Sequence, residues 1–134
     1  MSFERDIQLF SSALTKAMDN VFKDVVIQVG DKVIGFSPVL TGRFKGNWQM
    51  TIGNPANSSL NTFDPSGSST LAAIVADSQN LSAGQVAYIV NNLTYGYEIE
   101  SVGWHSGKAP YMPVLQTETF FRDIVEEAAR KFAL

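Results

Sequence analysis

The stretch NWQMTI, residues 47–52, places apolar and polar side chains in strict alternation. Trp48, Met50 and Ile52 fall on one side and the polar residues on the other, which is the period-two pattern of a half-buried β-strand. The segments on either side do not alternate in this way, so residues 47–52 locate one strand of the expected sheet. We therefore expect a small sheet with Trp48 in the core.

A second strand is predicted over Gln85–Asn91, after a turn at residues 82–84. Apolar side chains occupy both of its faces, whereas the first strand has one polar face. Because a strand that is apolar on both faces is usually covered on both, we expect this one to lie deeper than the first. Tyr88 is accordingly predicted to be a core residue.

The N-terminal segment has a helical period, and where that helix ends is open. The stretch 25–29 is β-branched, and Gly30-Asp31 could turn a hairpin into residues 32–34. A glycine inside a helix costs only about 1 kcal/mol. We favour one long helix, capped by Ser2 and ending before Pro38. Its apolar stripe comprises Phe3, Ile7, Phe10, Leu14, Ala17, Val21 and Val25.

Two more helices are predicted downstream. One runs from Thr70 to about Gln79, with Ser68 or Ser69 as its cap. The other begins near Pro113, which suits a first helical turn. The order predicts one α+β domain over residues 1–134: a long N-terminal helix and a small antiparallel sheet, with the central and C-terminal helices packed on it. The expected inward residues are Leu71, Ile74 and Val75 in the central helix, and Val114, Phe120, Phe121, Ile124, Val125, Ala128 and Phe132 in the last, with Phe121 in the core.

Two irregular segments are candidates for contacts with partners. Residues 53–67 form a polar run with little to bury, and we expect a flexible loop that is either an interface or a passive insertion. Residues 92–111 are rich in glycine and aromatics. Aromatic side chains anchor interfaces, so for this segment we favour an interface over packing on its own core. The aromatic residues concerned are Tyr95, Tyr97, Trp104 and Tyr111.

Composition excludes several classes of function. The 134 residues include no cysteine and carry a net charge of −3, and the ten basic residues are scattered. A nucleic-acid binder normally shows a basic stripe, so DNA or RNA binding by this chain alone is not expected. The charged N-terminus does not suit a signal peptide. No apolar run has the length of a membrane span, so we expect a cytoplasmic protein.

Few residues suggest chemistry, and we predict neither an enzyme nor a cofactor. His105 is the single histidine, and we favour an exposed loop residue over a metal ligand or catalytic group. Glu98 and Glu100 are interpreted as solvated surface. Arg43, in a glycine-flanked turn, is either a surface cation or one half of a bidentate pair with a neighbouring subunit's carboxylate.

Three segments resemble a known pattern. Residues 37–48, SPVLTGRFKGNW, resemble T/S-P-V-D-T-G-R-F/L-R-x-x-W, and residues 88–100, YIVNNLTYGYEIE, resemble Y-I-x-N-N-L-P-Y-A-x-x-L-E. Residues 104–110, WHSGKAP, are similar to W-S-x-Q-A-P. These are motifs of the tail-completion and head–tail joining (neck) proteins of long-tailed bacteriophages, and their order extends over nearly the whole chain. Leu40 departs from the pattern by replacing an Asp that could order the following turn; Thr94, Gly96 and Lys108 replace Pro, Ala and Gln.

The resemblance implies a structural virion protein without enzymatic activity, which completes the tail or joins it to the head. It implies a ring of identical subunits, with six favoured, and contacts with other neck and tail proteins. Genomic DNA would only pass through the channel, no membrane is involved, and assembly would occur in the host cytoplasm. Alternatives are a tail-terminator or minor tail protein, a cellular adaptor domain, and a small hydrolase or ligand-binding domain using His105. The motif positions and candidate interface residues are Thr41, Gly42, Arg43, Asn91, Asn92, Tyr95, Tyr97, Glu100, Trp104 and Pro110.

Overall fold

The computed structural model describes residues 2–102 and 110–134. Its dominant element is α1 (Phe3–Gly35), a single helix of 33 residues, so the hairpin alternative is wrong. The Ser2 hydroxyl accepts a hydrogen bond from the Arg5 N–H at 3.2 Å and caps the helix as predicted. Gly30 has a packing role, because an added Cβ would lie 3.1 Å from Ile74 of the central helix.

The sheet has two antiparallel strands, β1 (Trp48–Ile52) and β2 (Ala87–Asn91). Trp48 pairs with Asn91 and Met50 with Ile89. The remaining elements are α2 (Ser68–Ser78), α3 (Pro113–Lys131), a short 3-10 turn η1 (Lys45–Asn47) and a π-helical turn η2 (Glu98–Val102). The α+β class is therefore confirmed.

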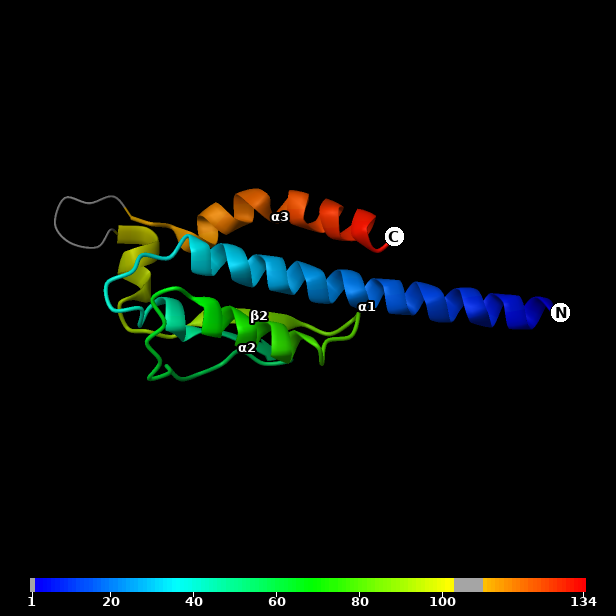
Figure 1. The fold of residues 1–134 in the computed structure, drawn as a ribbon, viewed down its shortest axis with the longest axis horizontal. Coiled ribbons are helices and arrows are strands. Elements are labelled where there is room, and N and C mark those ends of the chain that lie inside the picture. Colours follow the sequence, from blue (N-terminus) through cyan, green and yellow to red (C-terminus); the bar gives the residue numbers. More distant parts are fainter. Residues whose placement is uncertain (1, 103–109) are drawn as a thin grey trace.

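Helix α1 forms the middle of the molecule (Figure 1). On one side it packs against α2 and β1, and on the other against α3. The core lies where α1, α2 and β1 meet. The Trp48 indole, 5% exposed, donates a hydrogen bond to the Ser37 hydroxyl at 2.9 Å, so its predicted core position is confirmed. The other buried apolar residues of this core are Val26, Val33, Ile34, Phe44, Met50, Ile74, Leu81, Leu93 and Ile99.

Strand β2 lies less deep than β1, which corrects the expectation from its apolar faces. All five of its residues are half-buried, Tyr88 among them, whereas Trp48 and Met50 in β1 are buried. The reason is topological. Helix α2 packs on β1, so β1 is the strand that the helices cover. Tyr88 is therefore not a fully buried core residue.

The last helix is oriented only partly as predicted: Ile124 and Ala128 of the expected inward set are buried, but others are not. Phe121 is 49% exposed and not in the core, and Val114 is 49% exposed. Helix α3 instead rests on α1 through Thr117, Ile124 and Ala128, a narrower row of side chains. The larger apolar residues are thus left along its edge.

Polar contacts hold the segment between β1 and α2. The fully buried Asn47 accepts a hydrogen bond from the Leu60 N–H at 2.6 Å. The Gln49 side chain donates to the Ser58 carbonyl at 2.7 Å. The segment has no helix or strand through residue 64, as its composition predicts. These hydrogen bonds attach it to the domain, and its predicted flexibility and interface role stay predictions.

The first half of α1 leaves the body of the protein. Residues 3–16, which we call the arm, are all exposed. At 1.5 Å per residue, α1 is about 50 Å long, and in Figure 1 its blue N-terminal end projects well past the end of α3. None of the described helices is both long and apolar enough to cross a membrane.

Candidate functional site

The first motif forms a tight turn that needs a glycine. Gly42 has a φ of 85°, and an added Cβ would lie 2.3 Å from the Pro65 nitrogen. The Gly42 carbonyl accepts a hydrogen bond from the Asp64 N–H at 2.9 Å. The Thr41 hydroxyl accepts from the Arg43 N–H at 3.3 Å, so the turn is ordered although Leu40 stands where the neck-protein motif has Asp. These contacts join the motif to the segment before α2.

Arg43 is half-buried, and its Nε is enclosed without a hydrogen-bond partner among the described residues. Its carbonyl accepts a hydrogen bond from the Asn47 side chain at 2.7 Å. Leaving a buried donor unpaired costs free energy, but this Nε is enclosed by the chain itself and does not show whether the rest of the guanidinium binds another subunit. The pairing of Arg43 with another chain therefore stays a prediction.

Asp64 is a buried carboxylate that sequence reasoning missed. It accepts hydrogen bonds from both the N–H and the hydroxyl of Thr70, each at 2.8 Å. Burial opposes its ionisation, but hydrogen bonds from Thr70, Gly67 and Ser66 outweigh burial and lower its pKa below the ordinary value. Asp64 thus serves α2 in place of the predicted caps Ser68 and Ser69, which lie inside the helix, whose N-cap is Gly67. An Asp-Pro turn ahead of a helix was the available signal.

The asparagines of the second motif make hydrogen bonds to other parts of the chain. The Asn91 side chain donates to the Phe44 carbonyl at 2.8 Å. The Asn92 side chain donates to the carbonyls of Ala56, at 2.8 Å, and Ser58, at 3.2 Å. The second motif therefore holds both the first motif and the 53–67 segment in place.

Glu100 caps α3, which corrects its interpretation as solvated surface. Its two carboxylate oxygens accept hydrogen bonds from the N–H groups of Val114, at 3.0 Å, and Leu115, at 2.9 Å. A carboxylate at this end also suits the helix dipole. Glu98, by contrast, is exposed, in agreement with its predicted place on the surface.

The remaining predicted positions are scattered. Tyr95 is half-buried, with its ring centroid 6.4 Å from that of Phe44. Tyr97 is 70% exposed and Pro110 is half-buried. Trp104, with its predicted interface role, lies outside the described residues, and so does His105.

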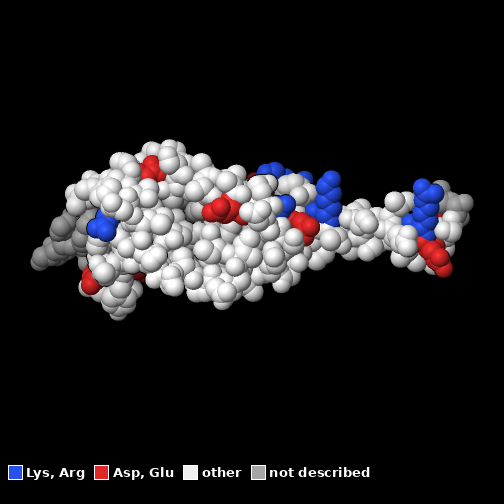
Figure 2. Space-filling model, turned by 90° about the horizontal axis from the view of Figure 1, so that it is seen from below, with Lys and Arg blue, Asp and Glu red and all other residues white. Residues whose placement is uncertain are grey.

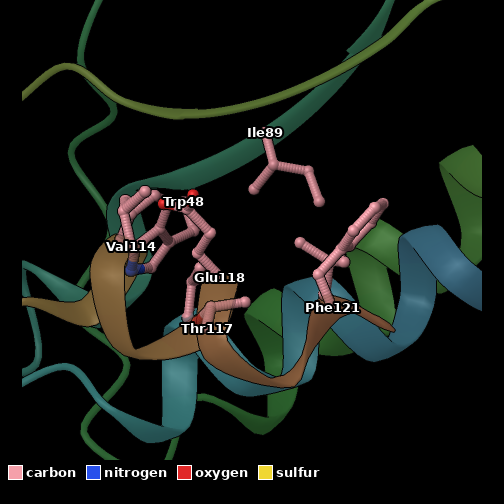
Figure 3. Close-up of a pocket in the computed structure, with 8 residues that line it drawn as sticks. Trp48, Ile89, Val114, Thr117, Glu118 and Phe121 are labelled. Atoms are coloured by element: carbon pink, nitrogen blue, oxygen red, sulfur yellow. The ribbon is translucent and has the colours of Figure 1, made fainter. Parts of the chain in front are cut away.

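An apolar cleft of about 310 Å³ runs between α3 and the sheet (Figure 3). Val29 and Val33 of α1 line it, together with Trp48 and Ile89 from the strands. In the close-up, Ile89 faces Phe121 of α3 across open space. The two polar lining residues are Thr117 and Glu118.

The cleft continues in both directions. Toward η2, a second hollow shares Trp48, Ile89 and Val114 with it and reaches the motif residues. Toward the end of α3, a third hollow shares Phe121 and reaches Met18. We call these three adjoining hollows beside α3 the groove. The motif residues that line its end are Asn91, Asn92, Tyr97 and Glu100.

The residues that line the groove suit contact with apolar side chains better than catalysis of a reaction. Within residues 2–102 and 110–134, no three His, Cys, Asp or Glu side chains gather as metal ligands would. Lys and Arg are dispersed over the face in Figure 2. The groove is therefore mainly an apolar surface, with polar side chains at the end near η2.

Comparison of the chain with protein-family models, curated proteins and solved structures found no match.

Proposed function

We propose that this chain is a structural subunit of the neck or tail end of a long-tailed bacteriophage, which completes the tail or joins it to the head. It acts in the virion as part of a ring of identical subunits, with six favoured. Its partners are its own copies and other neck or tail proteins. Genomic DNA passes through the ring without being held by it.

One observation carries the proposal: much of the apolar surface of the chain is unpaired in the single copy. Phe10 of the arm is 69% exposed, and Phe121 in the groove is 49% exposed. Monomeric proteins rarely leave contiguous apolar surface of this kind exposed, and larger patches mark sites of protein association. An assembly subunit needs such surfaces, whereas an enzyme needs converging polar groups.

The motif resemblance supplies the kind of assembly. Residues shared with the neck-protein motifs have definite tasks here: Gly42 makes the tight turn, Asn91 ties the strand to that turn, and Glu100 caps α3. Matching residues that all build one scaffold support a related fold more strongly than scattered identities would. A tail-terminator or minor tail protein is the second candidate, since such proteins would also expose surfaces for ring formation.

Mass spectrometry of gradient-purified virions tests the proposal. We expect the chain in intact particles, at a copy number that is a multiple of the ring size and small compared with that of the tail-tube subunit. The same measurement on separated heads and tails then shows which of the two carries the chain. Enrichment at the tail end far from the head would favour a different tail role, and absence from purified particles would refute a virion function. His105→Ala tests the alternative of a small hydrolase or ligand-binding domain. That alternative predicts that the variant loses hydrolysis or ligand binding while particles still assemble normally.

A further inference from the structure

The arm carries a continuous apolar seam. Phe3, Ile7, Phe10 and Leu14 are separated by alternating steps of four and three residues, which is the spacing of a helix that packs against another helix. These side chains are 78%, 50%, 69% and 39% exposed, in that order. Further along α1 the stripe meets Met18, which lines the near end of the groove.

The arm lacks the charges of a helix that stands alone in water. Residues 7–15, IQLFSSALT, contain no charged side chain. Figure 2 shows charged side chains at the tip of the projection and again near the body, with uncharged surface between them. Isolated surface helices usually carry charged faces or pairs of opposite charge. This composition is typical of a helix that is covered in its working state.

The same chain has an unfilled groove that its own arm cannot enter. The floor of the groove is α1 itself, through Val29 and Val33, and one wall is α3. Because the arm continues the same straight helix away from the body (Figure 1), it could reach the groove only by breaking α1. Within one copy, therefore, the groove stays empty and the apolar seam of the arm stays exposed.

We propose that the arm of one copy lies in the groove of a second copy, with Phe10 packed beside Phe121. This inference deepens the proposed function and rests on it for the role of the contact in a virion. The contact between two copies does not itself depend on that role. The contact joins two different surfaces, so it is heterologous. Contacts of this type repeat from copy to copy and form a closed ring when the rotation between copies closes, as the proposed function requires.

The available area suits a specific interface. Phe3 and Phe10, taken at about 200 Å² per aromatic side chain, offer on the order of 300 Å². Ile7 and Leu14 raise the apolar area of the seam to roughly 450 Å², and flanking arm atoms add to it. A standard interface buries about 800 Å² on each partner. The seam alone thus supplies a little more than half of that value, and the rest has to come from the flanking residues of the arm. The cleft of about 310 Å³ alone would admit only a few side chains, so the arm has to lie along the whole groove.

Two variants with a matched control test the contact in the purified full-length chain. Phe10→Glu places a charge in the middle of the apolar seam, and Phe121→Glu places a charge in the groove. Leu9→Glu is the control, since Leu9 is 58% exposed on the same arm but does not face the same side as its neighbour Phe10. We expect the wild-type chain and Leu9→Glu to sediment as oligomers, and Phe10→Glu and Phe121→Glu each to sediment at 14.6 kDa. Val114→Glu, also in the groove wall, replaces Phe121→Glu if the latter lowers the melting temperature.

Mixing the two blocked variants is the decisive measurement. Phe121→Glu keeps its arm and Phe10→Glu keeps its groove, so the mixture should form one-to-one pairs and stop there. If arms paired with arms, Phe121→Glu alone would remain oligomeric, which would overturn the proposal. A wild-type chain that stays monomeric up to its solubility limit, or a mixture that forms no pairs, would also overturn it. Failure here would leave a virion role standing, because the mass-spectrometric test of virions does not depend on the arm.

Discussion

Replacing Asn47 with alanine should break the hydrogen bonds that connect the turn of the first motif to the 53–67 segment. Asn47 is 0% exposed, and its side chain donates to the Arg43 carbonyl at 2.7 Å and accepts from the Leu60 N–H at 2.6 Å. Each hydrogen bond contributes about 0.5–1.5 kcal/mol, and a buried group left unpaired costs about 1–3 kcal/mol. We expect the free energy of unfolding to fall by about 2–4 kcal/mol. For a domain of this size, the melting temperature should fall by roughly 10 °C.

Urea denaturation gives the free energy, and amide hydrogen exchange locates the effect. The Leu60 amide should lose its protection in Asn47→Ala. The control is Gln49→Ala, which removes one exposed hydrogen bond to the same segment, at the Ser58 carbonyl. The control should cost less than about 1 kcal/mol. Equal losses in the two variants would refute the claim that the buried amide holds the segment.

Three further predictions follow from the core and the helix termini. Trp48→Ala should lower the free energy of unfolding by about 3–5 kcal/mol in urea titrations, and an unchanged melting temperature would contradict the core assignment. Asp64 has a lowered pKa in the folded state, so it stabilises the fold above its ordinary pKa near 4 and that stability is lost as the pH falls through the folded value. Asp64→Asn should therefore be less stable than wild type at pH 7, and its melting temperature should fall less steeply on acidification. Glu100→Gln should weaken the cap of α3 by about 1 kcal/mol in thermal melts, with Glu98→Gln as a neutral control.

Periodicity predicted the elements well because it reflects local geometry. The alternation around Trp48 and Met50 set β1, and the three-and-four spacing of α1 persisted through Gly30. The hairpin alternative at Gly30 was wrong because tertiary packing decided it: the glycine lets Ile74 approach α1. A single sequence shows that a glycine is present but not which helix crosses it.

The motif residues were harder to interpret, because an exposed polar residue and an internal link look alike in a sequence. Asn91 and Glu100 were both candidates for a subunit interface. The structure uses Asn91 to hold Phe44 and Glu100 to cap α3. Their partners lie 47 and 14 residues away in the chain, and no local pattern encodes such distances. Asp64 was missed for a related reason: its burial depends on the turn at Gly42, far from it in the sequence.

Several residues that were predicted to be buried are exposed, and their positions are informative. An apolar period says that a face must be covered but does not say by which molecule. Not all of these residues share one surface, since Phe120 is 40% exposed and stacks on Phe36 outside the groove. Val114 and Phe121, however, line the groove, and the exposed stripe from Phe3 to Leu14 lies on the arm. A second copy would cover both surfaces, which is the physical basis for the proposal that the arm of one copy lies in the groove of another.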